Sequence, residues 1–155
     1  MKNLILAGII YLIPFFVNAQ KINSDAIPYG KGVEFKVEYY INSKRISDPI
    51  TSRSVTVYKA PKYRIFKQGV YTFTNNSNED QIINFKKFYI LDEQDERHYA
   101  KFVVQSMRIN SNNKELEKTL KAGKTKTFII DFFPSLPKGQ TPRFGVDESL
   151  EIYED

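Results

Sequence analysis

The chain has 155 residues, no cysteine, and 23 Lys and Arg against 18 Asp and Glu. This length suits one domain, and the lack of cysteine excludes disulfides and a lipid-anchoring cysteine. The net charge of +5 is mild, and no run of like charge is long enough to predict a nucleic-acid-binding tail. We therefore expect a single domain that is held together by packing alone and has no nucleic-acid partner.

Residues 1–19 have the pattern of a secretory signal peptide. Lys2 precedes an apolar run from Leu4 to Val17, and Val17-Asn18-Ala19 forms a small-x-small cleavage pattern. The run is shorter than the ~20 residues that a membrane-spanning helix needs, which favours cleavage over a retained membrane anchor. The expected product is periplasmic or secreted, with no stable membrane span after cleavage.

Residues 20–31 mix polar residues with Pro28 and glycines, and we expect a short flexible leader there. One domain is then expected over 32–155. Its first strand alternates strictly, which is typical of a half-buried strand. The residues predicted to share its inner face are Val33, Phe35, Val37, Tyr39 and Ile41.

Further strands are predicted along the rest of the chain. Residues 53–59 form the next, with Val55 and Val57 inward, and residues 62–75 follow with a bulge or turn at Gly69. Later strands are expected over 81–92, 98–109 and 125–133. A final strand at 149–155 places Leu150 and Ile152 inward.

Two polar clusters separate these strands. "NNSNED", residues 75–80, is rich in residues that favour turns, and we interpret it as a β-hairpin loop whose asparagines have no other role. "DEQDER", residues 92–97, is interpreted as a second hairpin tip. Short strands with regular turns predict an all-β fold, an immunoglobulin-like two-sheet antiparallel β-sandwich of about seven or eight strands. A small closed barrel is the alternative.

The second half of the chain resembles a known group of domains. The matching elements are Asn75-Asn76-Ser77, the Leu120-x-x-Gly123-Lys124 turn and Phe132-Phe133-Pro134, spread over residues 70–153. They resemble the telokin-like, immunoglobulin-like domains of unknown function in exported bacterial proteins. The resemblance implies an envelope or extracellular module without known catalysis, and it supplies no functional residues.

Catalytic and metal-binding candidates are few. His98 is the sole histidine, and a strand-edge role is favoured for it over a Ser-His-Asp hydrolase because no Gly-x-Ser-x-Gly elbow is present. The carboxylates of Asp92, Glu93, Asp95 and Glu96 lack the spacing of a calcium loop, and a solvated hairpin tip explains them. We expect no enzyme activity, no cofactor and no metal.

The stretch "YKAPKYRIFK" interleaves basic and aromatic side chains. Its candidate binding residues are Lys59, Lys62, Tyr63, Arg64, Phe66 and Lys67. On a strand, Lys62, Arg64 and Phe66 share one face, and Tyr63, Ile65 and Lys67 share the other. Such a face can bind an anionic polymer by charge and stacking, and Lys121, Lys124 and Lys126 are candidates to extend it. A lysine-guarded edge strand is the structural alternative.

The function predicted from these features is a non-enzymatic exported binding or interaction module of the cell envelope. Its partner would be an envelope or extracellular protein, or an anionic glycan. An inhibitor or immunity-type protein that blocks an exported enzyme or toxin is the alternative, with "PSLPKGQTPR" or the "DEQDER" tip as the blocking loop.

Overall fold

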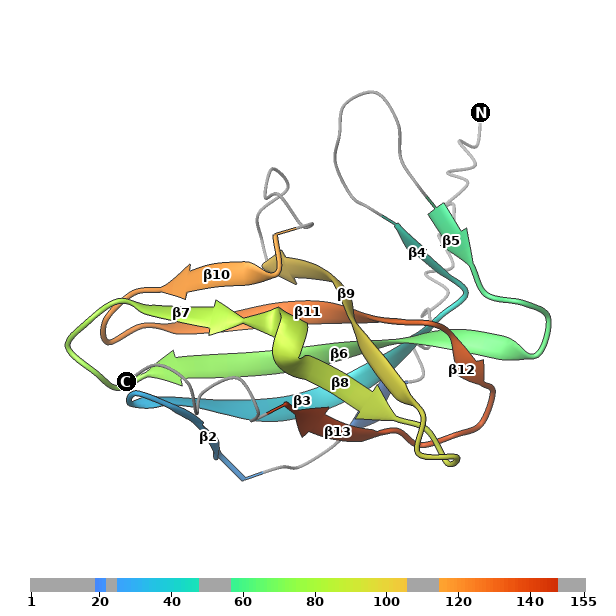
Figure 1. The fold of residues 1–155 in the computed structure, drawn as a ribbon, viewed down its shortest axis with the longest axis horizontal. Helices are drawn as coiled ribbons and strands as arrows, with labels where there is room; N and C mark the ends of the chain where they lie inside the picture. The colour runs from blue at the N-terminus through green and yellow to red at the C-terminus, as the bar shows by residue number, and fades with distance from the viewer. Residues whose placement is uncertain (1–18, 22–24, 48–56, 106–114, 148–155) are drawn as a thin grey trace, which may run out of the picture.

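The computed structural model of the chain describes residues 19–21, 25–47, 57–105 and 115–147. These residues form thirteen β-strands and one 3₁₀ helix, η1 (Figure 1). The strands are β1 (Ala19–Lys21), β2 (Ile27–Gly30), β3 (Val33–Ser43), β4 (Arg45–Ser47), β5 (Val57–Lys59), β6 (Arg64–Asn75), β7 (Gln81–Asn84), β8 (Phe88–Leu91), β9 (Arg97–Gln105), β10 (Glu117–Leu120), β11 (Thr125–Phe133), β12 (Leu136–Pro137) and β13 (Arg143–Val146), with η1 at Phe85–Lys87. Among the described residues, no helix is long and apolar enough to cross a membrane.

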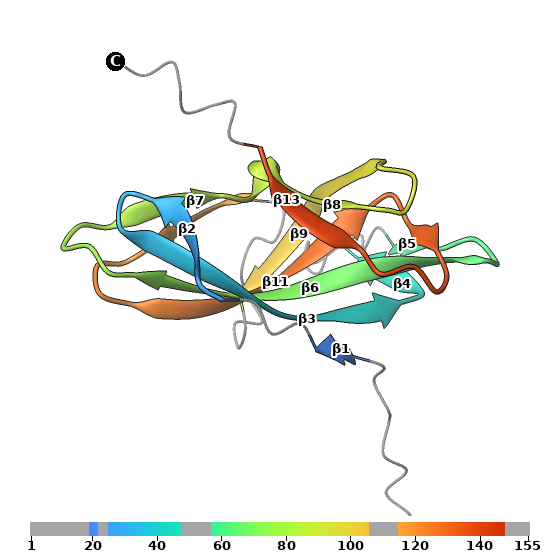
Figure 2. The same cartoon turned by 90° about the horizontal axis from the view of Figure 1, so that it is seen from below.

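Most strands belong to one curled antiparallel sheet, ordered β1-β3-β6-β11-β9-β8-β13, with β2 added to β3 and β12 added to β6. Two further pairs, β7 with β10 and β4 with β5, complete the fold. The sheet curls so that β8 and β13 lie over β3 and β6, and Figure 2 shows the resulting layers edge-on. The predicted all-β sandwich is confirmed, with more strands than the seven or eight expected because several are only two to four residues long.

Aromatic side chains fill the space between the layers. The ring of Phe35 on β3 lies 5.5 Å from that of Phe88 on β8, and Phe73 on β6 lies 5.5 Å from Phe85 of η1. All four side chains are fully buried or nearly so. Burying a side chain of this size contributes roughly 1.5–3 kcal/mol, so these contacts hold the layers together without disulfides.

The inward face of β3 differs from the predicted strict alternation. The register against β6 shifts between Val37 and Tyr39, and this bulge at Glu38 turns Tyr40 inward in place of Tyr39. Tyr40 donates or accepts a hydrogen bond of 3.1 Å with the Tyr71 hydroxyl in the core. A β-bulge inserts one residue on one strand, and every later side chain then changes face.

Gly69 is not the bulge or turn that the sequence suggested. It lies in a continuous ladder, opposite Tyr40 on one side and Ile130 on the other. A Cβ atom at this position would come within 2.4 Å of the Tyr71 ring and 3.0 Å of the Tyr40 ring. Gly69 is therefore required by ring packing against the middle of β6.

The N-terminal part of the described chain is more ordered than the predicted leader. β2 pairs with β3, and the Tyr29 ring packs 6.0 Å from Phe88 while its hydroxyl accepts a hydrogen bond from the Asn84 backbone N–H.

Elsewhere, Val57 is 45% exposed and not inward as predicted. Residues 1–18 of the predicted signal peptide, Val55 and the predicted strand at 149–155 lie outside the described residues.

The "NNSNED" loop does not close a hairpin. β6 pairs with β3 and β11, whereas β7 pairs with β10, so the loop carries the chain from one layer to the other. Asn75 is fully buried, and its amide donates to the carbonyls of Glu79 (2.8 Å) and Leu120 (3.0 Å). Its oxygen accepts from the backbone N–H and the hydroxyl of Ser77. The hairpin prediction is wrong, and Asn75 ties the crossing loop to β10.

A second apolar cluster lies on the outer face of the sheet, under the β4–β5 hairpin. It consists of Ile46, Phe66 and Phe102, with Tyr58 and Ala60 packed against them.

Asp131 is a buried carboxyl in this sheet. It is 3% exposed, and its carboxyl accepts a hydrogen bond of 2.6 Å from the Gln68 amide. Burial raises the pKa of Asp131 to about 6, although the Gln68 hydrogen bond partly opposes the rise. The fold therefore favours the protonated form of this side chain.

We predict that Asn75→Ala lowers the free energy of unfolding by about 3 kcal/mol, because buried carbonyl and N–H groups lose their partner. Urea denaturation monitored by circular dichroism measures the loss. Asn76→Ala, at the exposed neighbouring position, serves as the control and is expected to stay within about 0.5 kcal/mol of the parent. Equal effects of the two substitutions would contradict the structural role of Asn75.

We predict that Asp131→Asn stabilises the protein at neutral pH. The folded state holds the Asp131 proton more tightly than the unfolded state, so the Asp131 contribution to stability falls as pH rises from about 4 to about 6. The stability difference between variant and parent should thus grow by on the order of 2–3 kcal/mol over this range. Urea titrations at several pH values test it, with the exposed Asp25→Asn as the control. A difference that stays flat with pH would refute the prediction.

Candidate functional site

Three segments distant in sequence meet at one end of the sandwich, the right-hand end in Figure 1. They are the β3–β4 turn, the β5–β6 loop and the residues after β12. The Ala60 N–H donates to the Lys44 carbonyl (2.9 Å), and the Lys138 N–H donates to the Tyr63 carbonyl (3.0 Å). We call this surface the basic end and define it by Lys44, Lys62, Tyr63, Arg64 and Lys138.

Lys44 organises the basic end. Its ammonium donates to the carbonyls of Pro61 (3.5 Å), Lys62 (3.3 Å) and Arg64 (2.8 Å), and so fixes the β5–β6 loop. Desolvation lowers the pKa of Lys44, and the neighbouring Lys138 ammonium lowers it further. The fold thus brings two positive side chains together beside a fixed loop.

Arg64 joins the loop to the β11–β12 connection. Its Nε donates to the Ser135 carbonyl (2.8 Å) and hydroxyl (3.3 Å), and a second guanidinium nitrogen also donates to that carbonyl. Tyr63 next to it is 72% exposed, with the Lys62 ammonium 5.4 Å from its ring centroid. Arg64 is therefore committed to structure, whereas Lys62 and Tyr63 face solvent.

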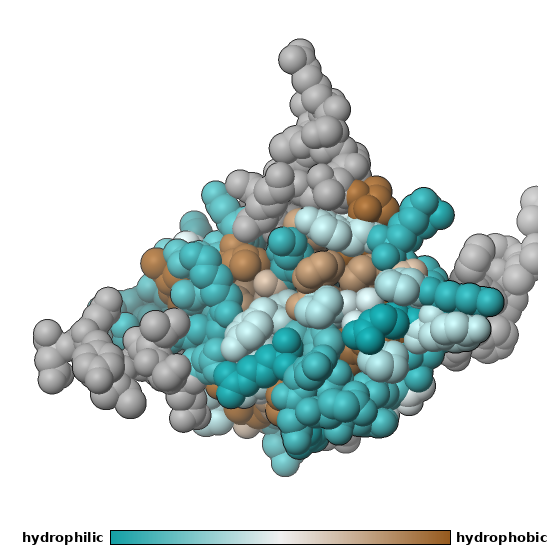
Figure 3. Space-filling model, turned by 45° about the vertical axis from the view of Figure 1, so that its right-hand side comes forward, coloured by the Kyte–Doolittle hydropathy of each residue, from teal (hydrophilic) through white to brown (hydrophobic). Residues whose placement is uncertain are grey.

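An aromatic strip adjoins the basic end through the Phe133–Ser135 segment. We define it by Tyr58, Lys101 and Phe133. The two rings lie 5.3 Å apart, and the Lys101 ammonium lies 5.7 Å from one and 5.8 Å from the other. The face turned forward in Figure 3 shows apolar residues gathered among hydrophilic ones. The end of the sandwich therefore combines cations with exposed aromatic rings.

Charge is distributed unevenly over the chain. Residues 40–47, 57–67, 97–105 and 133–143, which build the basic end and the aromatic strip, contain ten Lys and Arg and no Asp or Glu. Arg97 and Arg143 find acids from other segments, Asp147 and Asp95. Within the described residues, no ion pair is formed by Lys44, Lys59, Lys62, Lys101 or Lys138. The lysines of this end therefore have no ion-pair partner in the described part of the chain, although the acidic turn at 92–96 lies against residues 140–143.

The six candidate residues separate into two groups. Lys62, Tyr63 and Arg64 belong to the basic end, and Lys59 is exposed on β5. Phe66 is only 2% exposed because it faces the outer apolar cluster, so its predicted place on a solvent-facing basic surface is wrong. Lys67 is 4% exposed, and burial lowers its pKa. These two side chains serve the packing of β6.

The lysines proposed to extend the site lie at the other end of the molecule. Lys126 pairs with Phe73 near the end of β6, whereas Arg64 begins that strand. At ~3.3 Å per residue the two ends of β6 are roughly 35 Å apart. Lys121, Lys124 and Lys126 therefore do not extend the basic end.

Lys44, Lys138, Lys101 and Phe133 were missed by the sequence interpretation. They come from three separate segments, and no local spacing links them. The signal that could have found them is the absence of acids from several basic segments together.

His98 and the acidic turn form a structural clasp. β8 and β9 pair across the turn as predicted, but β9 lies between β8 and β11, so His98 is fully buried and not at a strand edge. Its Nδ1 lies 2.8 Å from the Pro134 carbonyl and its Nε2 lies 3.2 Å from Asp92. Asp92 is 2% exposed, so this member of the predicted solvated tip is inside. The clasp fastens the hairpin to the β11–β12 connection.

Asp92, Glu96 and His98 offer ligand atoms within 4.8 Å of one another, close enough to hold a metal ion. However, Asp92 already accepts from the backbone N–H groups of Gln94 and Glu96, and its other carboxyl oxygen lies 3.2 Å from the His98 Nε2. Burial alone would raise the pKa of Asp92, but these hydrogen bonds lower it overall. A cation would have to displace the hydrogen bonds that fix the turn, so the cluster is better explained as a set of structural contacts than as a metal site.

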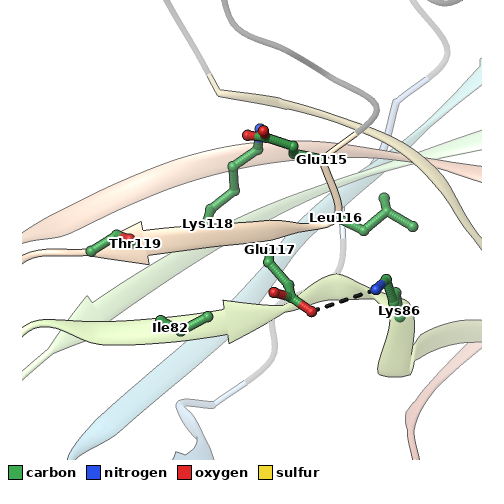
Figure 4. Close-up of a pocket in the computed structure, with 7 residues that line it drawn as sticks. All are labelled: Ile82, Lys86, Glu115, Leu116, Glu117, Lys118 and Thr119. Carbon is green, nitrogen blue, oxygen red and sulfur yellow. Dashed lines mark hydrogen bonds and ion pairs between the residues drawn. The ribbon is translucent and has the colours of Figure 1, made fainter.

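A hollow between β7 and β10 is shown in Figure 4. It is lined by Ile82, Lys86, Glu115, Leu116, Glu117, Lys118 and Thr119. Lys86 and Glu117 form an ion pair of 3.5 Å across it. Its mixed charges compensate one another, unlike those of the basic end.

The comparisons with known proteins support the fold alone. No family model and no curated protein matches the chain. Among solved structures, the chain is similar to an uncharacterized beta-sandwich protein from Clostridium difficile 630, with a TM-score of 0.51 and 8% identity. The similarity covers 79% of this chain and 83% of that chain. It agrees with the β-sandwich architecture described above.

Phe66 on β6 is buried, whereas Tyr63 in the loop before β6 is exposed, and this difference can be tested by substitution. We predict that Phe66→Ala lowers the free energy of unfolding by about 3–5 kcal/mol, because it empties the outer apolar cluster. Tyr63→Ala should change stability by no more than about 0.5 kcal/mol, because the side chain lies on the surface. Thermal and urea unfolding of both variants provide the measurement. Similar losses in both would contradict the division between core and surface.

Proposed function

We propose that this protein is an exported, non-enzymatic binding module that contacts an anionic partner through its basic end. The observation that carries the proposal is the grouping of uncompensated lysines around the exposed Tyr63, on segments without any acid. A surface of one charge attracts oppositely charged partners and accelerates their association. Solvent-facing Lys62 and Lys138 supply direct contacts, while Lys44 and Arg64 hold the loop in place.

Export is part of the proposal and rests on the sequence. The pattern of residues 1–19, the lack of cysteine and the resemblance to telokin-like, immunoglobulin-like exported bacterial domains all favour a periplasmic or secreted protein. The β-sandwich architecture is compatible with that resemblance.

A binding role is favoured over catalysis by the state of the sole histidine. Both ring nitrogens of His98 face structural partners, and the ring is fully buried. A general base must reach a substrate proton, directly or through one water. The cations at the basic end are three lysines and an arginine, which suit anion recognition.

An inhibitor or immunity-type protein remains the second candidate, for one structural reason. The two loops predicted to block an enzyme lie against each other, because the Gln140 side chain bonds both the Glu93 N–H (3.4 Å) and the Gln94 side chain (3.2 Å). A pre-organised loop pair loses little entropy on binding. In this case the partner would be an exported enzyme or toxin.

We predict that the protein captures partners from envelope extract and that Lys62→Glu/Lys138→Glu loses them. Reversing two charges turns attraction into repulsion at the basic end, and capture by the parent should weaken as salt is raised. Pull-down with quantified yield measures both effects.

The matched control is Lys121→Glu/Lys124→Glu, which makes the same charge change on exposed lysines at the far end of the sandwich. This variant should retain the captured material. Equal retention by all three proteins would rule out the basic end as the binding surface.

A further inference from the structure

Lys44 and Lys138 bring two ammonium groups together without an acid between them. The Lys138 ammonium lowers the pKa of Lys44, and the Lys138 backbone N–H donates to the Tyr63 carbonyl on the loop that Lys44 holds. Lys44 is held against the loop by three carbonyls, so it cannot turn away from its neighbour without losing these hydrogen bonds. Two like charges in such proximity repel, and an anion placed beside them would relieve the repulsion.

Lys62 and Tyr63 form the other side of the same small surface. The Lys138 backbone N–H donates a hydrogen bond to the Tyr63 carbonyl, so the segments that contain Lys138 and Tyr63 lie side by side. Tyr63 is the most exposed large apolar side chain in the described part of the chain. The surface therefore offers positive charge beside one accessible aromatic ring.

We propose that the basic end binds the anionic group of a glycan, a sugar carboxylate or phosphate, between Lys138 and Lys62, with a sugar ring against Tyr63. This inference rests on the proposed function and narrows its partner to a carbohydrate. Ammonium groups make strong charge-assisted hydrogen bonds to carboxylate and phosphate oxygens. An aromatic side chain adds a large contact area and a polar hydroxyl at its edge.

The exposed groups around Tyr63 suit a sugar. Tyr63 is 72% exposed with the Lys62 ammonium 5.4 Å from its ring, whereas Phe66 is buried and Ile65 is half-buried. A protein partner would need about 800 Å² on each side with an apolar centre, and would have to cover the aromatic strip as well. One ring with flanking cations matches one or two sugar units.

Lys44 is a positioning residue in this proposal. Its ammonium orders the Pro61–Arg64 loop, whereas Lys62 and Lys138 touch the ligand. Lys44→Met should therefore weaken glycan binding and also speed amide hydrogen exchange at residues 62–64, a readout that loss of a ligand contact alone would not change.

The test is calorimetric titration of the purified protein with hexagalacturonate, mannose 6-phosphate and inorganic phosphate. Galactohexaose and mannose are the neutral counterparts of the two sugars. We expect at least one anionic sugar to bind ~10-fold or more tightly than its neutral counterpart. Lys62→Glu/Lys138→Glu should lose that binding by about tenfold or more, whereas Lys121→Glu/Lys124→Glu should stay within about twofold. Tyr63→Ala should weaken binding of the sugar and leave inorganic phosphate unchanged.

Three results would overturn the inference. Anionic and neutral sugars could bind equally, both double variants could lose affinity equally, or phosphate could bind while every sugar fails. If no anionic sugar binds but an acidic protein is captured through the basic end, the proposed function stands and the glycan inference falls. If Lys62→Glu/Lys138→Glu changes neither sugar binding nor capture, both fall.

Discussion

Strand β6 is hydrogen-bonded along its length to β3 on one side and to β11 on the other. Its inner face carries Tyr71 and Phe73 into the main core, and its outer face carries Phe66 into the second cluster. Because both faces and both edges are occupied, the position of β6 is fixed, and so are its two ends. The first residue of β6, Arg64, belongs to the basic end. The last residue, Asn75, places its buried amide at the opposite end of the sandwich.

The strands that alternate in sequence could be predicted because alternation reflects burial on one face of a sheet. What could not be predicted depends on partners far along the chain. The bulge at Glu38 exists because of the register against β6, and Asn75 gains its role from the Leu120 carbonyl, 45 residues later. A turn-forming composition shows that the chain changes direction, but not whether the flanking strands pair with each other or with others.

The candidate site shows the same division. Lys62, Tyr63 and Arg64 were found because charge and aromatic character are adjacent in sequence, but the face of each side chain followed from packing. Phe66 points into a cluster with Ile46 and Phe102, which only the folded chain brings together. Lys44 and Lys138 reach the site through backbone bonds to Ala60 and Tyr63, and no spacing in the sequence encodes those bonds.

Some opposite charges of the described structure meet at the surface, where Arg97 pairs with Asp147 and Arg143 with Asp95. Exposed pairs of this kind contribute little to stability, so a fold can leave cations unpaired at small cost. The clustering of those unpaired cations is therefore the informative feature. A protein that needed its lysines only for solubility could scatter them, whereas this fold gathers Lys62 and Lys138 around an exposed ring and uses Lys44 and Arg64 to hold their loops.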